Sequence, residues 1–249
     1  MSTMPLARNR QSITVRVEGL SVLLGSFQLG PLDLEARPGV TAILGPNGSG
    51  KTTLLRAVNG LIPSAQGSAR TADFDLMACD ANVRRRVAFV PDSEEMLFSE
   101  LTLDQFWSFV IGIRERSFGD DPDVLIERAA ELSEQLGLEP GKARMREFSM
   151  GMKRKAQLIT GLIAEPDLLM IDEPQSGLDF VSSRKVRRAL QELSERGATV
   201  IMSNHDLDSV ARVADYVVII RDGQIVATSD EPFASGDECE RFVAGYFEQ

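Results

Sequence analysis

The sequence is poor in cysteine and histidine. Its 249 residues include two cysteines, Cys79 and Cys239, and a single histidine, His205. Two isolated cysteines give neither a disulfide framework nor metal-ligand spacing. Such sparse cysteine usage is typical of a protein that works in a reducing compartment, so we expect a cytoplasmic location.

Long apolar runs are also missing. No run approaches the roughly 20 residues that a helix needs to span a bilayer. Residues 1–11 lack the apolar core of a signal peptide. If this chain helps to move a substrate across a membrane, we expect the pore to be another chain. The protein would then sit on the inner face of the membrane through that partner.

Positive charge is scarce as well, since the formal net charge is −10. A general nucleic-acid binder normally has a basic balance, so we expect no nucleic-acid partner. The short basic stretches at 84–86, 153–155 and 184–185 fit helices, and their default interpretation is a solvated face.

What the sequence does contain is a glycine-rich loop between an apolar strand and a helix. Glycines lack a Cβ, so the backbone can wrap around a phosphate with its N–H groups pointing inward. The lysine would reach the β- and γ-phosphates, and the first threonine would ligate Mg²⁺. This pattern predicts a nucleotide-binding P-loop, formed by Gly45, Pro46, Asn47, Gly48, Ser49, Gly50, Lys51, Thr52 and Thr53.

A second apolar strand, 168–171, ends in Asp172 and Glu173. Neighbouring residues at a strand end point in different directions, so one carboxylate can serve a metal and the other a water. We assign Asp172 to Mg²⁺ and Glu173 to the role of general base or water-positioning residue. The alternative is an acidic helix cap, which the nearby P-loop makes the lesser interpretation.

A third apolar strand, 200–203, leads to His205. A lone histidine is often incidental, but open α/β sheets place ligand sites at the carboxyl ends of strands. His205 is therefore a candidate donor to a γ-phosphate or to the attacking water.

These motifs, taken in order, resemble the ATP-binding cassette (ABC) ATPases over about residues 13–227. The resemblance is carried by 45–53, Ser149 and Gly151 in the signature segment, 171–174, 176–179 and His205. It implies ATP hydrolysis and a head-to-tail dimer with a second ABC subunit. In such a dimer, the signature helix faces ATP held by the other subunit. It also implies a transmembrane subunit as partner, docked by a helical subdomain whose candidate contacts here are Phe98 and Trp107.

Three motifs depart from the family pattern. The signature has Met150 and Met152 where glycine and glutamine are usual, although a helix N-terminus with a serine still suits phosphate. Asp92 stands where the family has a metal-sensing glutamine, so it is either a metal ligand or part of a solvated acidic turn. The usual adenine-stacking tyrosine is replaced by Leu24, with Phe27 nearby.

The expected fold class is α/β: a P-loop core with a mostly parallel sheet, an N-terminal antiparallel β part and a helical subdomain. We place the core at 12–96 and 165–230, the helical subdomain at 97–164 and a C-terminal segment at 231–249. The sequence favours the ATPase subunit of a transporter, more in the manner of an exporter because 90–92 resemble an exporter variant. The alternatives are a soluble ABC ATPase in an assembly process, such as iron–sulfur cluster biogenesis, and a nucleotide sensor without turnover, which Lys51, Glu173 and His205 together disfavour.

Overall fold

The strands form two sheets. The computed structural model describes residues 13–78, 80–93, 97–139 and 141–247, so Cys79 and residues 1–11, which were considered for a signal peptide, lie outside the described residues. The strands are β1 (Val15–Leu24), β2 (Phe27–Ala36), β3 (Gly39–Leu44), β4 (Gln66–Arg70), β5 (Val87–Val90), β6 (Leu168–Ile171), β7 (Thr199–Ser203), β8 (Tyr216–Arg221) and β9 (Gln224–Ser229).

The larger sheet has six strands in the order β5-β6-β7-β3-β8-β9, and only β8 and β9 pair antiparallel. The hairpin between them turns at Asp222 and Gly223, both with positive φ, as a two-residue turn requires. The smaller sheet is antiparallel, in the order β2-β1-β4. The predicted α/β class is therefore confirmed.

Strand alternation divides the apolar residues between two cores. Val40, Ala42 and Leu44 of β3 face a core shared with the helical layer, whereas Ile43 faces a core shared with the antiparallel sheet. Both faces of the central strands are buried, as expected for parallel strands with layers on both sides. These strands could be predicted from the sequence because their apolar runs are uninterrupted.

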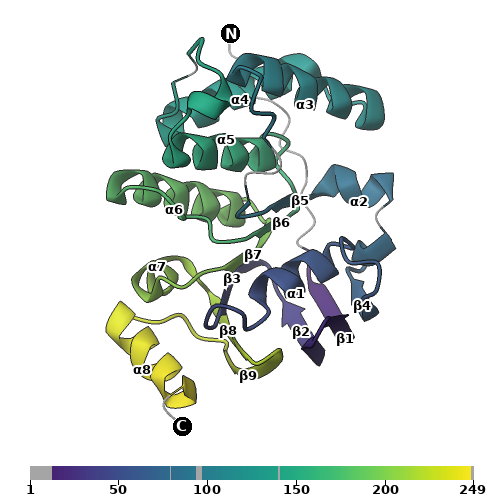
Figure 1. Cartoon of the computed structure of the whole chain (residues 1–249), viewed down its shortest axis with the longest axis vertical. Helices are drawn as coiled ribbons and strands as arrows, with labels where there is room; N and C mark the ends of the chain where they lie inside the picture. Colours follow the sequence, from purple (N-terminus) through teal and green to yellow (C-terminus); the bar gives the residue numbers. More distant parts are fainter. Residues whose placement is uncertain (1–12, 79, 94–96, 140, 248–249) are drawn as a thin grey trace.

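The helices occupy the ends and flanks of the sheet (Figure 1). In the figure, α3, α4 and α5 lie together at the top, and α7 and α8 lie at the bottom. The bounds are α1 (Lys51–Val58), α2 (Ala81–Arg86), α3 (Leu103–Phe118), α4 (Pro122–Leu136), α5 (Met150–Leu162), α6 (Phe180–Glu195), α7 (Leu207–Val213) and α8 (Gly236–Phe247), with 3-10 turns η1 (Leu76–Ala78) and η3 (Met145–Glu147).

Helices α3, α4 and α5 fall within 97–164, the range predicted for a helical subdomain; the division into subdomains itself stays a prediction. Asp121 caps α4 and Gly137 ends it, where the pair Asp121-Pro122 and the glycine predict the start and the end of a helix. No helix among the described residues combines the length and the hydropathy needed to cross a bilayer.

Some local predictions were wrong. The sequence predicts strands at 67–71 and 86–90 with a loop between them, but this segment holds α2, which buries only Val83 and so gives little periodic signal. The helical spacing of Leu103, Phe106, Phe109, Val110 and Ile113 predicts one buried apolar face on α3, but only part of that face is buried. Phe109 and Ile113 are 44% and 40% exposed, while Trp107, considered for docking, is buried.

Candidate functional site

The P-loop lies between the end of β3 and the start of α1. Gly45 has φ 156°, and a Cβ there would lie 2.2 Å from the carbonyl oxygen of Ile220 and 2.6 Å from Oγ of Ser49. The backbone at position 45 passes so close to the Ile220 carbonyl that no side chain fits there. Glycine is therefore required at this point of the loop.

Helix α1 begins without a side-chain cap. Its N-cap is Gly50, with φ 109° and no side-chain hydrogen bond. By contrast, Ser149, Asp179 and Asp206 cap α5, α6 and α7 through their side chains. The first-turn N–H groups of α1 are thus left for an anion, which the positive end of the helix dipole also favours.

Lys51 is buried next to this helix end, with 6% of its surface exposed. Its Nζ donates to the carbonyl oxygens of Gly45 and Pro46, at 2.7 and 3.1 Å. Carbonyls hold the ammonium in place without neutralising it. The positive charge therefore remains available to a phosphate chain.

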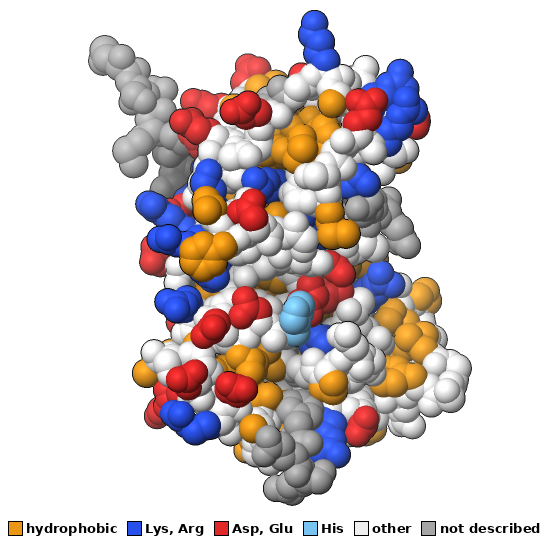
Figure 2. All heavy atoms as spheres, turned by 60° about the vertical axis from the view of Figure 1, so that its left-hand side comes forward, with side chains coloured by type: hydrophobic (Ala, Val, Ile, Leu, Met, Phe, Trp, Pro, Cys, Tyr) orange, Lys and Arg blue, Asp and Glu red, His pale blue; other side chains and the backbone are white. Residues whose placement is uncertain are grey.

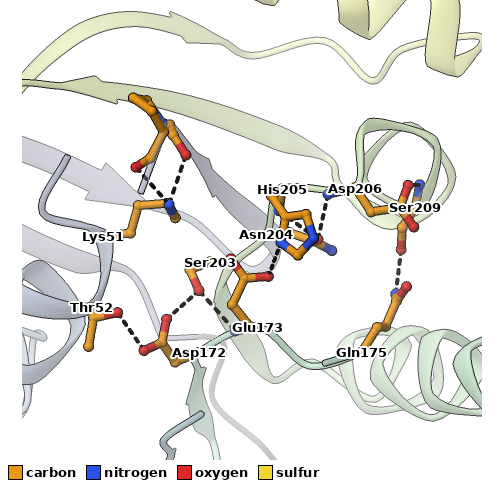
Figure 3. A network of polar contacts seen from close by, with 12 residues as sticks. Lys51, Thr52, Asp172, Glu173, Gln175, Ser203, Asn204, His205, Asp206 and Ser209 are labelled. Carbon is orange, nitrogen blue, oxygen red and sulfur yellow. Dashed lines mark hydrogen bonds and ion pairs between the residues drawn. The ribbon is translucent and has the colours of Figure 1, made fainter. Parts of the chain in front are cut away.

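Asp172 joins the P-loop to the sheet (Figure 3). The hydroxyl of Thr52 donates to its Oδ2 at 2.6 Å, and the hydroxyl of Ser203 donates to its Oδ1 at 2.5 Å. The carboxylate is 3% exposed. Two of the residues assigned to the metal, Thr52 and Asp172, are in direct contact because β6 and β3 flank β7.

Glu173 adopts a strained backbone conformation, with φ 48°. Left-handed φ values are uncommon for residues other than glycine and cluster at functional sites. The hydroxyl of Ser203 accepts from its N–H at 2.9 Å, and its Oε2 lies 2.7 Å from Nδ1 of His205. The structure thus brings together two of the residues selected from the sequence, Glu173 and His205.

A buried arginine, Arg154, holds the same segment from the side of α5. Its guanidinium donates to the carbonyl oxygens of Asp172 and Glu173, at 2.5 and 3.0 Å, and to that of Pro91 at 2.7 Å. Burial lowers the pKa of this guanidinium, against the attraction of Asp92, Asp172 and Glu173. The expectation of a solvated basic face at 153–155 was therefore wrong for Arg154, which is 3% exposed.

Sequence reasoning also missed Ser203 and Asn204. Ser203 bridges Asp172 and Glu173, and Oδ1 of Asn204 accepts from the backbone N–H groups of His205 and Asp206, at 2.8 and 2.9 Å. Both directly precede His205 at the end of β7. Their polar side chains after an apolar strand were the available signal.

The signature residues are not brought to the P-loop of the same chain. Ser149 is exposed and caps α5, with the N–H of Met152 donating to its Oγ at 3.2 Å. Helix α5 lies in the upper helical layer, well away from α1 (Figure 1). Gly151 and Met150 pack against Gly177: a Cβ at Gly151 would lie 3.2 Å from the Gly177 oxygen, and one at Gly177 would lie 2.5 Å from Met150.

The remaining candidates are less defined. Asp92 is exposed directly after Pro91, and its role at the metal stays a prediction. Leu24 is 46% exposed at the end of β1. Phe27 is half-buried and packs against the P-loop, since a Cβ at Gly50 would lie 3.0 Å from its ring.

The donor set fits a nucleotide with Mg²⁺. Ser49 Oγ is buried in the loop without a hydrogen-bond partner, and Lys51 has only carbonyl acceptors. Among the described residues, no group of three or more His, Cys, Asp or Glu side chains forms a metal site. This suits Mg²⁺, which usually takes one or two protein ligands and completes its shell with phosphates and water.

The fold and this loop together define a P-loop nucleoside triphosphatase. The family model described as ABC transporter matches residues 29–176. An ABC transporter ATP-binding protein of Methanopyrus kandleri is 38% identical over 200 residues, covering 79% of this chain and 73% of that protein. A solved structure of an ATP-binding subunit of an ABC transporter superposes with TM-score 0.78 at 26% identity, covering 92% and 99% of the two chains. The chain belongs to the ABC transporter ATP-binding family and is an ATPase that uses ATP and Mg²⁺.

Two relatives named for opposite directions of transport have similar sequence identity to this chain. The sulfate/thiosulfate import ATP-binding protein CysA of Vibrio cholerae is 32% identical over 240 residues, covering 94% of this chain and 63% of its own. The Nod factor export ATP-binding protein I of Cupriavidus metallidurans is 33% identical over 200 residues, covering 79% and 64%. Overall similarity does not assign a direction to this chain.

Proposed function

We propose that this chain is the ATP-hydrolysing subunit of a transporter whose membrane-spanning part is a separate polypeptide. The observation that carries the proposal is the bonded series Thr52–Asp172–Ser203–Glu173–His205. It links the P-loop to the two groups suited to activating a water.

In this proposal each side chain of the site has one task. Lys51 and the N–H groups at the start of α1 bind the phosphates. Thr52 and Asp172 hold Mg²⁺, which neutralises charge on the phosphate oxygens when bound. Glu173 accepts the proton of the attacking water, and His205 orients the Glu173 carboxylate through their 2.7 Å contact.

We further propose that two subunits close head to tail over two ATP molecules. The exposed Ser149 at the start of α5 supports this arrangement: its side chain accepts from the N–H of Met152, and the other N–H groups of the first turn, with the serine hydroxyl, suit the phosphate held by a partner. The partner is a second copy or a related subunit. Met150 beside Gly177 then lies where the two subunits meet.

Two features support docking of a membrane partner. A groove of about 550 Å³ lies beside β5 and is lined by residues that include Leu61, Phe89 and Pro91. Near the start of α3, the exposed ring of Phe98 stacks edge-on against Phe109, with centroids 5.3 Å apart. Large apolar groups left exposed together commonly mark an interaction surface.

The direction we propose is export, and it rests on the turn at 90–92. Asp92 follows Pro91 at the place of the usual glutamine, and this turn resembles the variant found in some exporter ATPases. The cargo contacts would lie in the partner chain, so the proposal names no cargo.

The test is affinity purification of the tagged chain from detergent-treated membranes of its source cells. We expect a polytopic membrane protein to co-purify with the unmodified chain and with a Lys142→Ala control. The double variant Phe98→Ser/Phe109→Ser should lose it while still hydrolysing ATP. Recovery of the ATPase from the soluble fraction alone, with no membrane protein bound, would contradict the proposal and favour an assembly ATPase.

A further inference from the structure

A groove on the flank of α6 and α7 is lined by nine residues, of which five are cationic. Its volume is about 710 Å³. Its positive residues come from both helices, and Val181, Gln191, Ala211 and Ala234 complete the lining: Arg184, Lys185, Arg187, Arg188 and Arg212. Figure 2 shows Lys and Arg side chains gathering at the left-hand edge of the molecule, at the height of α6.

Most of this charge has no carboxylate partner. Arg188 pairs with Glu192 at 2.8 Å. Within the described ranges, Arg184, Arg187 and Arg212 form no salt bridge with a carboxylate. Burial, and then the charge of Arg212, lowers the pKa of Arg187; Arg184 adds to this and Asp206 opposes it. Unpaired like charges held together destabilise the fold. Here the positive charges are gathered in one place although the chain as a whole has a net charge of −10.

The groove is also structurally fixed. Residues 184, 187, 188 and 191 follow helical spacing and therefore share one face of α6. Gln191 Nε2 donates to the carbonyl oxygen of Arg212 at 2.9 Å, which ties that face to α7. The cations of the two helices are thus held beside a common space.

The geometry points to a second ligand site: we propose that this groove binds a solute or headgroup carrying two or more phosphate groups. A guanidinium group can donate two parallel hydrogen bonds to the oxygens of one phosphate. The groove has four arginines and one lysine. The volume falls within the range of small-molecule sites, roughly 300–1,000 Å³. The groove is made by α6 and α7, whereas the P-loop and Asp172 are not among its lining residues.

The test is calorimetry with inorganic tripolyphosphate. The P-loop is first saturated with ADP in Mg²⁺-free buffer, so that only a second site is titrated. We expect one site in the unmodified protein and a loss of at least tenfold in affinity in Arg187→Gln/Arg212→Gln. The matched control, Arg16→Gln/Arg37→Gln, removes two exposed arginines at the antiparallel sheet and should bind like the unmodified protein. Both double variants are checked by unfolding midpoint.

A flotation assay distinguishes the two sources of phosphate. The vesicles are phosphatidylcholine, with or without phosphatidylinositol bisphosphate. Binding of tripolyphosphate without flotation supports a soluble ligand. Flotation that needs the bisphosphate and is competed by tripolyphosphate supports a headgroup. Equal tripolyphosphate affinity in both double variants, no binding in either assay, or binding of polyglutamate in preference to tripolyphosphate would overturn the proposal.

Discussion

The imidazole Nδ1 of His205 lies 2.7 Å from Oε2 of Glu173, across the ends of two neighbouring strands (Figure 3). An ionised carboxylate only accepts hydrogen bonds, so Nδ1 must carry the proton in this contact. The other ring nitrogen then stays available on a side chain that is 72% exposed. The contact therefore fixes both the tautomer of the ring and the direction of the carboxylate.

The first prediction concerns Glu173→Gln. Glutamine keeps the shape of the side chain and loses the base, so ATP binding should persist while turnover falls by about 10²–10⁴-fold. ATP-bound dimers should accumulate and be seen by gel filtration. Glu195→Gln, an exposed change on α6, is the control and should leave turnover unaltered. Turnover of Glu173→Gln near the unmodified rate would exclude Glu173 as the base.

The second prediction concerns the tautomer of His205. Because this is the only histidine in the chain, its ring nitrogens can be observed by ¹⁵N NMR without assignment. At pH 9, where an ordinary imidazole is neutral, we expect the Nδ1–H form to dominate. Glu173→Ala should shift the ring toward the mixture seen in free histidine. A dominant Nε2–H form in the unmodified protein would show that the contact with Glu173 does not persist in solution.

The third prediction is that Lys51→Ala weakens nucleotide binding itself. A hydrogen bond to a charged group contributes roughly 1.5–3 kcal/mol, which corresponds to about tenfold to over a hundredfold in affinity. Calorimetry with ATP measures this loss, with Lys142→Ala as the control. Unchanged affinity in Lys51→Ala would count against the assigned role of the P-loop lysine.

The fourth prediction concerns Arg154→Lys. One ammonium cannot reach the carbonyls of Asp172, Glu173 and Pro91 together, so buried acceptors would lose their donors. We expect the free energy of unfolding to fall by about 3 kcal/mol. We also expect kcat to fall with little change in the KM for ATP, since Arg154 positions the carboxylates and is not placed to touch the nucleotide.

The control for this change is Lys155→Ala on the same helix, which should alter neither quantity. A fall in stability without any fall in kcat would assign Arg154 a purely structural role. Arg154→Met tests the charge separately, and we expect it to be no more active than the lysine variant.

The sequence predicted the contacts within each motif better than those between motifs. The P-loop, the pair Asp172–Glu173 and the strand before His205 were readable because short apolar runs end in polar residues. The burial and the contacts of Arg154 could not be predicted, because it stands between Lys153 and Lys155 in a run that favours a solvated face. Its burial depends on how α5 packs against β6, and no local pattern reports that packing. The bond between Glu173 and His205 likewise depends on β6 and β7 being neighbours in the sheet.

The last prediction concerns the choice of nucleotide base. The usual stacking tyrosine is absent, and Leu24 at its place is 46% exposed at the end of β1. Phe27 packs against Gly50, so its ring already supports the P-loop. Contacts to the phosphates and Mg²⁺, which do not depend on the identity of the base, would then supply most of the binding free energy. We expect GTP to be hydrolysed within about tenfold of ATP, a gap of about 1.4 kcal/mol.

The variant that checks this idea is Leu24→Tyr. An aromatic ring stacked on a base is worth about 1–3 kcal/mol, so ATP should bind more tightly to this variant, by roughly fivefold to over a hundredfold. Fluorescence titration measures the binding, and parallel assays compare turnover of the two nucleotides. Leu23→Tyr is the control, because Leu23 is exposed one residue earlier, on the opposite face of the strand. A hundredfold preference of the unmodified protein for ATP would contradict the prediction of weak base discrimination. A residue other than Leu24 would then have to bind the adenine.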